Sequence, residues 1–170
     1  MPLNLRYALY GILALLVAGT IIIGLKKWLK PGPGDPELWL RMRSWWIMAG
    51  LFILAIAVDR AFSIVFFALV SFLALKEYFS IIPTRRADRR VLFWAYAAIP
   101  VQYFWVYEAW FGMFIIFIPV YLFLLIPLKM VVVGETQGFL KAAGTIHWGL
   151  MTTVFSLSHA AYLLALPDAK

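Results

Sequence analysis

The sequence predicts an all-α fold, namely a polytopic membrane protein with about six transmembrane helices and both termini outside. Of its 170 residues, 65% are hydrophobic and 14% are charged, whereas soluble domains have about 45–50% apolar and about 25% charged residues. The mean hydropathy is +0.91. A soluble protein of this size could not bury so much apolar surface, because its surface-to-volume ratio is too high.

Six apolar runs define the expected spans, since a helix needs roughly 20 residues to cross a bilayer core of ~30 Å. The runs cover residues 7–25, 45–58, 61–82, 91–107, 110–128 and 145–166. Residues 31–36 hold three prolines and two glycines, so no helix is expected there. Residues 129–144 are weakly amphipathic.

Tight turns and prolines complete this plan. Asp59-Arg60 and Glu108 interrupt apolar sequence, so each is expected at the tip of a helical hairpin. Pro100, Pro119 and Pro127 are expected to kink the fourth and fifth spans. We divide the chain into residues 1–44, a first transmembrane helix with a cytoplasmic Pro/Gly linker, and residues 45–170, a membrane domain of five helices.

The basic residues orient the spans. Eleven of the fifteen fall in three alternate loops, as Lys26, Lys27, Lys30, Arg41, Arg43, Arg85, Arg86, Arg89, Arg90, Lys129 and Lys141. The positive-inside rule places these loops in the cytoplasm. The net charge of +7 therefore indicates topology and anionic lipid rather than nucleic acid as a partner.

Few side chains suit catalysis. The chain has no cysteine, which excludes a disulfide framework and a thiol nucleophile. Its two histidines, His147 and His159, are too few and too far apart for a zinc site. No phosphate-binding glycine loop or nucleophile elbow is present, so no catalytic and no metal-binding residue is expected in this chain.

Four charged residues are candidates for binding a lipid phosphate. Arg41 and Arg43 precede Trp45-Trp46, and guanidinium groups match phosphate oxygens, although such flanks also serve as ordinary interfacial anchors. Lys76 and Glu77 follow an apolar run, where they indicate a polar cavity or else reach the interface by extending their side chains. The arginines of residues 85–90 attract phosphatidate or a nucleotide, or form a solvated loop.

Gln102, Ser158 and His159 are candidates to line a cavity, because polar groups inside an apolar span must face other helices or water. Interhelical hydrogen bonding is the alternative interpretation of the same residues.

Four segments resemble the phosphatidate cytidylyltransferase (CDP-diacylglycerol synthase) family, most closely its longer-chain bacterial paralogues. They are residues 41–46 (RMRSWW), 67–78 (FALVSFLALKEY), 134–140 (GETQGFL) and 151–161 (MTTVFSLSHAA). The resemblance implies the reaction of CTP with phosphatidate to give CDP-diacylglycerol and pyrophosphate, at a bacterial inner (cytoplasmic) membrane.

Members of that family are roughly twice as long as this chain. Their second half carries a Lys-Arg pair, a Lys-Asp pair, a Pro-Gly-His-Gly-Gly turn and the aspartates that hold divalent metal and CTP. The resemblance thus implies the amino-terminal half of such an enzyme, with a second membrane subunit bringing the Asp-rich catalytic half and its Mg²⁺. Two other functions stay open: a scaffold or regulatory protein with the same fold, and a small lipid or solute transporter.

Overall fold

The computed structural model describes residues 3–29, 35–57, 59–83, 85, 89–134 and 137–166. These residues are helical with short connections and contain no strand, so the all-α prediction is confirmed for them. The chain divides into unit 1, Met1–Asp59, and unit 2, Arg60–Asp168. Three helices in the described part are long and apolar enough to cross a membrane, Leu9–Leu29, Arg60–Ile81 and Phe111–Val132. The count of six and the side of the termini stay predictions.

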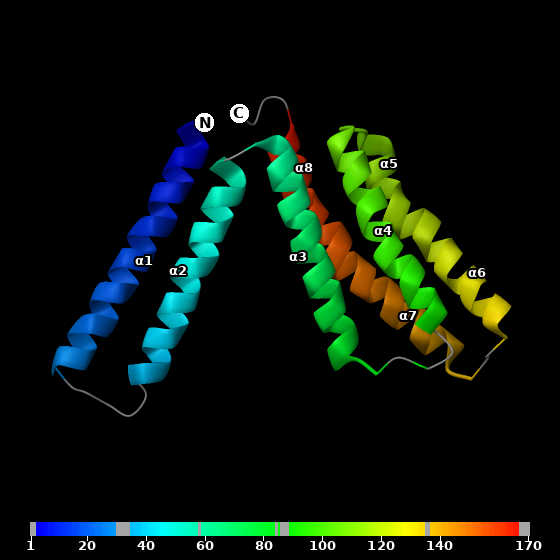
Figure 1. Ribbon diagram of the computed structural model, residues 1–170, viewed down its shortest axis with the longest axis horizontal. Coiled ribbons are helices and arrows are strands. Elements are labelled where there is room, and N and C mark those ends of the chain that lie inside the picture. The colour runs from blue at the N-terminus through cyan, green and yellow to red at the C-terminus, as the bar shows by residue number, and fades with distance from the viewer. Residues whose placement is uncertain are drawn as a thin grey trace. The chain divides into compact units, whose positions relative to one another are not determined.

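Unit 1 is a hairpin of two antiparallel helices, α1 (Leu3–Leu29) and α2 (Asp35–Ala57) (Figure 1). The indole Nε1–H of Trp46 donates to Thr20 Oγ1 at 3.0 Å, and Thr20 Oγ1 donates to Leu16 O at 2.8 Å. These bonds give each polar group a partner between two apolar helices.

The start of α2 corrects the sequence-based boundary. We expected no helix over residues 31–36 and a span from residue 45, yet α2 begins at Asp35 and includes Pro36. Proline is tolerated in the first helical turn, where its missing N–H has no intrahelical partner to lose. Residues 31–34 lie outside the described part.

Unit 2 is a bundle of four helical rods. The first two are α3 (Arg60–Ile81) and α4 (Arg89–Tyr107). The third runs through α5 (Phe111–Ile116), the π segment η2 (Phe117–Leu122) and α6 (Phe123–Val133). The fourth runs through α7 (Phe139–Gly149), the π segment η3 (Leu150–Phe155) and α8 (Ser156–Ala165). The region 129–144 is therefore not one element, because α6 ends and α7 begins within it.

The expected turn at Glu108 is present as a complete helix C-cap. Ala109 N donates to Val106 O and Trp110 N donates to Trp105 O, with Ala109 at φ 52°. This is the Schellman pattern, and the Trp105 and Trp110 rings, 5.4 Å apart, make its hydrophobic contact. Arg60 Nη2 donates to Tyr107 O at 2.7 Å, so a cation from α3 also satisfies the end of α4.

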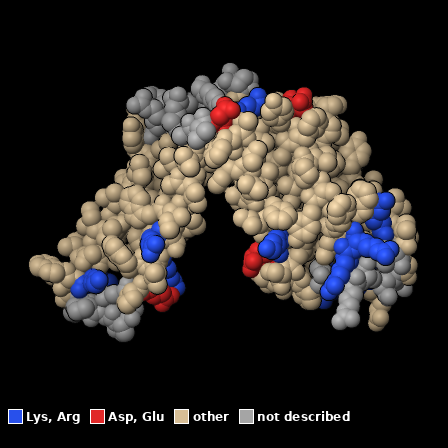
Figure 2. All heavy atoms as spheres, in the orientation of Figure 1, with Lys and Arg blue, Asp and Glu red and all other residues tan. Residues whose placement is uncertain are grey.

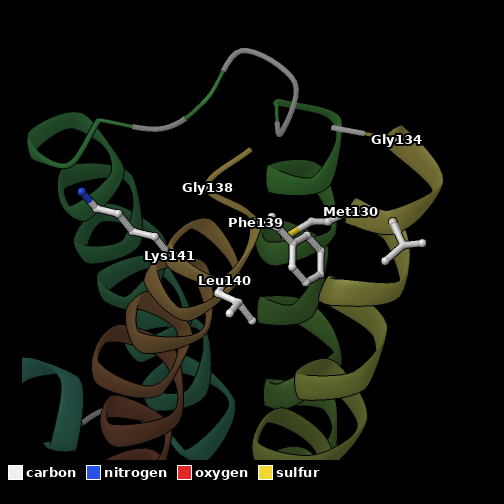
Figure 3. Close-up of a pocket in the computed structure, with 7 residues that line it drawn as sticks. Met130, Gly134, Gly138, Phe139, Leu140 and Lys141 are labelled. Atoms are coloured by element: carbon white, nitrogen blue, oxygen red, sulfur yellow. The ribbon is translucent and has the colours of Figure 1, made fainter. Parts of the chain in front are cut away.

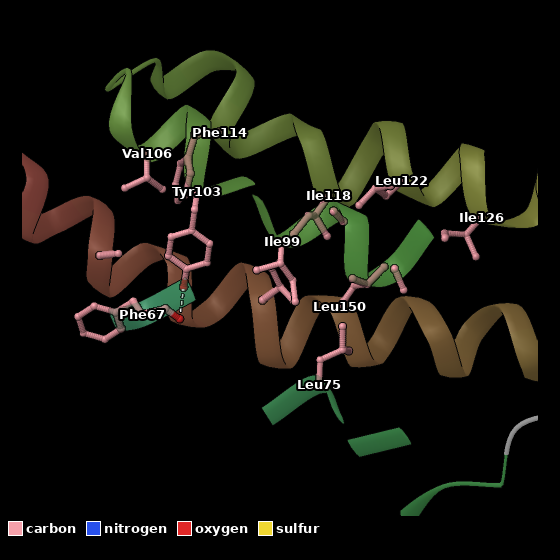
Figure 4. Packing of buried hydrophobic residues seen from close by; sticks show 14 of the residues in the cluster. Phe67, Leu75, Ile99, Tyr103, Val106, Phe114, Ile118, Leu122, Ile126 and Leu150 are labelled. Atoms are coloured by element: carbon pink, nitrogen blue, oxygen red, sulfur yellow. Dashed lines mark hydrogen bonds between the residues drawn. The ribbon is translucent and has the colours of Figure 1, made fainter. Parts of the chain in front are cut away.

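The core of unit 2 is mainly apolar and includes a buried pair of hydroxyl groups. Side chains such as Phe114, Ile118 and Leu150 fill the space between the rods (Figure 4). The Tyr103 hydroxyl, on α4, donates to Phe67 O at 2.9 Å and lies 2.8 Å from Ser71 Oγ, on α3. Hydrogen bonds of this kind join helices where water cannot.

The two π segments pack against each other. Pro119 lies in η2, whereas Pro100 and Pro127 lie inside α4 and α6. Pro119 has no N–H, so it leaves a carbonyl about one turn earlier without its usual donor. Gln102 Nε2 donates to Phe114 O at 3.1 Å, which supplies a donor from another rod.

Gly149 allows the fourth rod to touch α3. A Cβ at Gly149 would lie 2.6 Å from Tyr78 Cε1, and the Tyr78 hydroxyl donates to Thr145 O at 2.9 Å. We expect Gly149→Ala to lower the free energy of unfolding by about 1–3 kcal/mol through overpacking, as measured by thermal unfolding in detergent micelles. Gly144→Ala is the control, because a Cβ there meets nothing within 4 Å. Equal melting temperatures for both variants would contradict the packing argument.

Candidate functional site

Apart from Arg60 at the start of α3, the described basic side chains of unit 2 gather at one end of the bundle (Figure 2). At this end α3 and α6 end and α4 and α7 begin. The described members are Lys76, Arg85, Arg89, Arg90, Lys129 and Lys141. Lys129 Nζ lies 4.7 Å from the centre of the Trp94 ring, a cation–π contact that links α6 to α4. Two of the three basic loops that the sequence assigns to one side of the membrane, those that follow α3 and α6 in unit 2, are thus close together in space.

One cavity at this end lies between the end of α3 and the start of α7, and we call it the α3–α7 cavity. Its volume is about 420 Å³. The described lining residues are Ile82, Pro83, Arg85, Gly138, Lys141, Ala142, Thr145 and Ile146. Two are cations and none is a carboxylate, so the cavity combines apolar walls with positive charge. Such a lining favours an anion that carries hydrocarbon.

A second cavity lies between the end of α6 and the start of α7, and we call it the α6–α7 cavity. Its volume is about 490 Å³, and its described lining is Met130, Val131, Gly134, Gly138, Phe139, Leu140 and Lys141. Figure 3 shows Met130 and Phe139 facing each other across the gap between α6 and α7. This cavity is apolar except for Lys141, which also lines the first cavity.

Two glycines shape the turn that separates α6 from α7. Gly134 caps α6 at φ 80° and Gly138 precedes α7 at φ 69°, both in the left-handed region that favours glycine. Gly138 provides no side-chain cap, so the first N–H groups of α7 lack the partner that a capping side chain would give. The positive end of the helix dipole therefore adds to the charges of Arg85 and Lys141.

Arg85 lies in the connection between α3 and α4 and lines the α3–α7 cavity. A contact with the turn between α6 and α7 holds its side chain there. Its Nη1 donates to the carbonyl of Gln137, and the side chain is half-buried. Lys141 is exposed on the first turn of α7. The sequence predicted that Arg85 either attracts phosphatidate or a nucleotide or belongs to a solvated loop, and Lys141 was used for topology alone. It did not connect the two residues, because they lie far apart in the chain. The sequence feature that could have pointed to this site is the pair Gly134 and Gly138, because these glycines mark the turn between α6 and α7.

None of the four predicted phosphate-binding residues is among the described lining residues of the two cavities. Arg41 and Arg43 are exposed on α2 of unit 1, and Arg41 Nη2 is 2.6 Å from Glu37 Oε1. Lys76 and Glu77 are exposed on α3 and are not among the lining residues of either cavity. A phosphate-binding role for these four side chains stays a prediction.

Gln102 and Ser158 come together in the core. Both are 0% exposed, and Gln102 Nε2 donates to Ser158 Oγ at 3.1 Å. Half-buried His159 shares the Phe155 carbonyl with Ser158, since Ser158 Oγ lies 2.7 Å and His159 Nδ1 lies 2.8 Å from that oxygen. Other residues line the two cavities described above, so cavity lining by this trio stays a prediction. Gln102 Oε1 is buried without a hydrogen-bond partner.

The described residues bring no three His, Asp or Glu side chains together as a metal-ion site. The carboxylates whose surroundings are known are dispersed, with Glu37 paired to Arg41 in unit 1 and Glu108 at the α4–α5 turn. The side chains described in this chain therefore do not fit a magnesium centre.

Comparison with known proteins finds a curated relative and a matching family model. The chain is 39% identical over 166 residues to a protein of Escherichia coli (strain K12) described as "Uncharacterized protein YnbB". The match covers 98% of this chain and 54% of the relative, so the chain spans about half the length of the curated relative it matches. No solved structure matches it. The model of the cytidylyltransferase family matches residues 39–169, and the chain therefore belongs to the cytidylyltransferase family.

Proposed function

We propose that this chain is the non-catalytic membrane subunit of a two-chain phosphatidate cytidylyltransferase in a bacterial inner membrane. The observation that carries the proposal is the family match over residues 39–169, on a helical bundle with a cationic, apolar-walled cavity at one end. In this account the chain supplies a slot for the lipid and a helical surface for assembly. A second membrane subunit supplies the carboxylates that bind Mg²⁺ and CTP.

The reaction assigns a clear task to each subunit. A phosphate oxygen of phosphatidate attacks the α-phosphorus of CTP, a new P–O bond forms, and the bond to the β-phosphate breaks to release pyrophosphate. Both reactants are anions, so positive potential near the membrane surface favours their approach. Arg85 and Lys141 provide it here, whereas the dispersed carboxylates of the described residues do not provide metal ligands.

The experiment is to isolate the chain from its native membrane in a mild detergent and to assay the eluate for Mg²⁺- and CTP-dependent conversion of phosphatidate. We expect activity together with a co-eluting, Asp-rich membrane protein of similar size. An inactive eluate without such a protein would contradict the two-chain enzyme. It would favour a scaffold or regulatory protein that retains the fold of the family without its chemistry.

A further inference from the structure

We propose that the α3–α7 cavity and the α6–α7 cavity form one two-chamber site for a phospholipid with a phosphomonoester head group. The phosphate lies between Arg85 and Lys141, and a hydrocarbon chain enters the chamber lined by Met130 and Phe139. The inference rests on the proposed function for the identity of the lipid. The site itself is argued from the geometry of unit 2.

The two chambers share part of their lining. Gly138 and Lys141 line both cavities. A Cβ at Gly138 would meet nothing within 4 Å, so the backbone at the junction has open space beside it. Any L side chain there would be strained at φ 69° and would project into that space. Glycine therefore keeps the junction between the chambers open.

Lys141 has an apolar stem and a charged head group, which suits a position between an apolar and a charged chamber. Lys141 lines both cavities, and Figure 3 shows its side chain extending from α7 away from Met130 and Phe139. Lysine commonly packs its methylene stem on apolar surface and keeps the charge at the polar boundary. The same side chain can thus contact the hydrocarbon in one chamber and the phosphate in the other.

The charged chamber suits a phosphomonoester. A guanidinium matches two phosphate oxygens in its plane and an ammonium adds a compact charge, so Arg85 and Lys141 together balance a dianion. The start of α7, at Gly138, contributes N–H groups and the positive end of its dipole to the same chamber. A phosphodiester lipid carries one negative charge and would leave part of this positive potential uncompensated.

The apolar chamber suits a hydrocarbon chain. Among its lining residues Met130 is 1% exposed, Phe139 is half-buried, and Leu140 is 84% exposed. A cavity of about 490 Å³ is within the usual range for small-molecule sites, about 300–1,000 Å³. Free inorganic phosphate would use only the charged chamber.

The test measures equilibrium binding of radiolabelled phosphatidate to the purified full chain in mixed micelles with phosphatidylcholine. We expect Arg85→Gln and Lys141→Gln each to raise the Kd by about ten- to a hundredfold, as for lost charge-assisted hydrogen bonds. Arg89→Gln removes the same charge from an exposed residue that lines neither cavity, and its Kd is expected within about twofold of wild type. A wild-type Kd in folded Arg85→Gln and Lys141→Gln variants would overturn the site.

A second pair of variants, one substitution at the cavity and one control away from it, tests the apolar chamber. We expect Leu140→Gln, in the lining of the chamber, to weaken phosphatidate binding by about three- to tenfold through lost apolar burial. Leu163→Gln is the control, because Leu163 is 64% exposed on α8 and lines neither cavity. Equal effects of the two substitutions would overturn the hydrocarbon chamber.

Competitors distinguish the possible sources of the phosphate. Phosphatidylglycerol and inorganic phosphate are each expected to compete at least tenfold more weakly than phosphatidate. Equal competition by inorganic phosphate would replace the lipid site with a free-phosphate site, and equal competition by phosphatidylglycerol would remove the preference for a phosphomonoester. The assay contains neither CTP nor a second subunit. Specific binding with an inactive complex would therefore overturn the proposed function alone, and activity without sensitivity to Arg85 and Lys141 would overturn this inference alone.

Discussion

Replacing Gln102 with alanine is expected to lower the free energy of unfolding by about 2–4 kcal/mol, because it removes a buried amide that joins three helical rods. The amide is wholly buried and donates to Phe114 O and to Ser158 Oγ, on two different rods. Truncation to alanine leaves a cavity, and Phe114 O and Ser158 Oγ each lose the hydrogen-bond donor that Gln102 provides. Hydrogen bonds between membrane helices contribute about 0.6–2 kcal/mol each, which sets the lower end of the range.

The measurement is reversible unfolding in detergent micelles, followed by circular dichroism. Val101→Ala is the control, because Val101 is the adjacent residue and is 38% exposed. Ser158→Ala is expected to cost less than Gln102→Ala, since it leaves the bond from Gln102 to Phe114 O intact. A Gln102→Ala variant as stable as Val101→Ala would show that this buried contact does not hold the rods together.

Replacing both cavity cations, Arg85→Gln with Lys141→Gln, is expected to reduce cytidylyl transfer by the assembled enzyme about 100-fold or more at low phosphatidate concentration. The reason is the loss of two charge-assisted contacts to one phosphate, each worth about 1.5–3 kcal/mol. Because these residues hold the lipid rather than the metal or CTP, the KM for phosphatidate should rise while the KM for CTP stays near its original value.

Arg89→Gln combined with Arg90→Gln is the matched control, since it removes two charges from exposed positions at the start of α4. A similar loss of activity in that control would mean that the general surface potential, and not the α3–α7 cavity, attracts the lipid. An unchanged KM for phosphatidate in the cavity variant would also contradict the assignment.

Much of the helical plan could be predicted because the bilayer imposes a length on each apolar run. The expected span 61–82 corresponds to α3, Arg60–Ile81, and the expected turn at Glu108 separates α4 from α5. The boundaries at Asp35 and Phe139 were missed, since charged and small residues in the first turns lower the hydropathy without preventing a helix.

The π segments could not be predicted from the apolar pattern. Pro119 marks a weak point in the third rod, but the sequence does not show whether a kink or a π register accommodates it. In the structure η2 packs against η3, and Gln102 donates to Phe114 O beside it. The local backbone geometry thus depends on a neighbouring rod.

The site was predicted less well than the fold. Ser158 and Gln102 could be identified as residues that need polar partners, but their meeting across the bundle depends on which helices pack together. Arg85 was predicted, with the other arginines of residues 85–90, either to attract phosphatidate or a nucleotide or to form a solvated loop. Lys141 was used for topology alone, because positive charge near a membrane surface is common. Their joint position on one cavity follows from the antiparallel order of the rods, which places the α3 end beside the α7 start.

The most direct test of the two-chain account is reconstitution in phosphatidylcholine vesicles that contain phosphatidate, with Mg²⁺ and CTP labelled at the α-phosphate. Three samples are compared: this chain alone, its co-purified Asp-rich partner alone, and the two together. The account predicts that label enters the lipid only when both chains are present. Transfer by this chain alone, or by the partner alone at the rate of the pair, would contradict it.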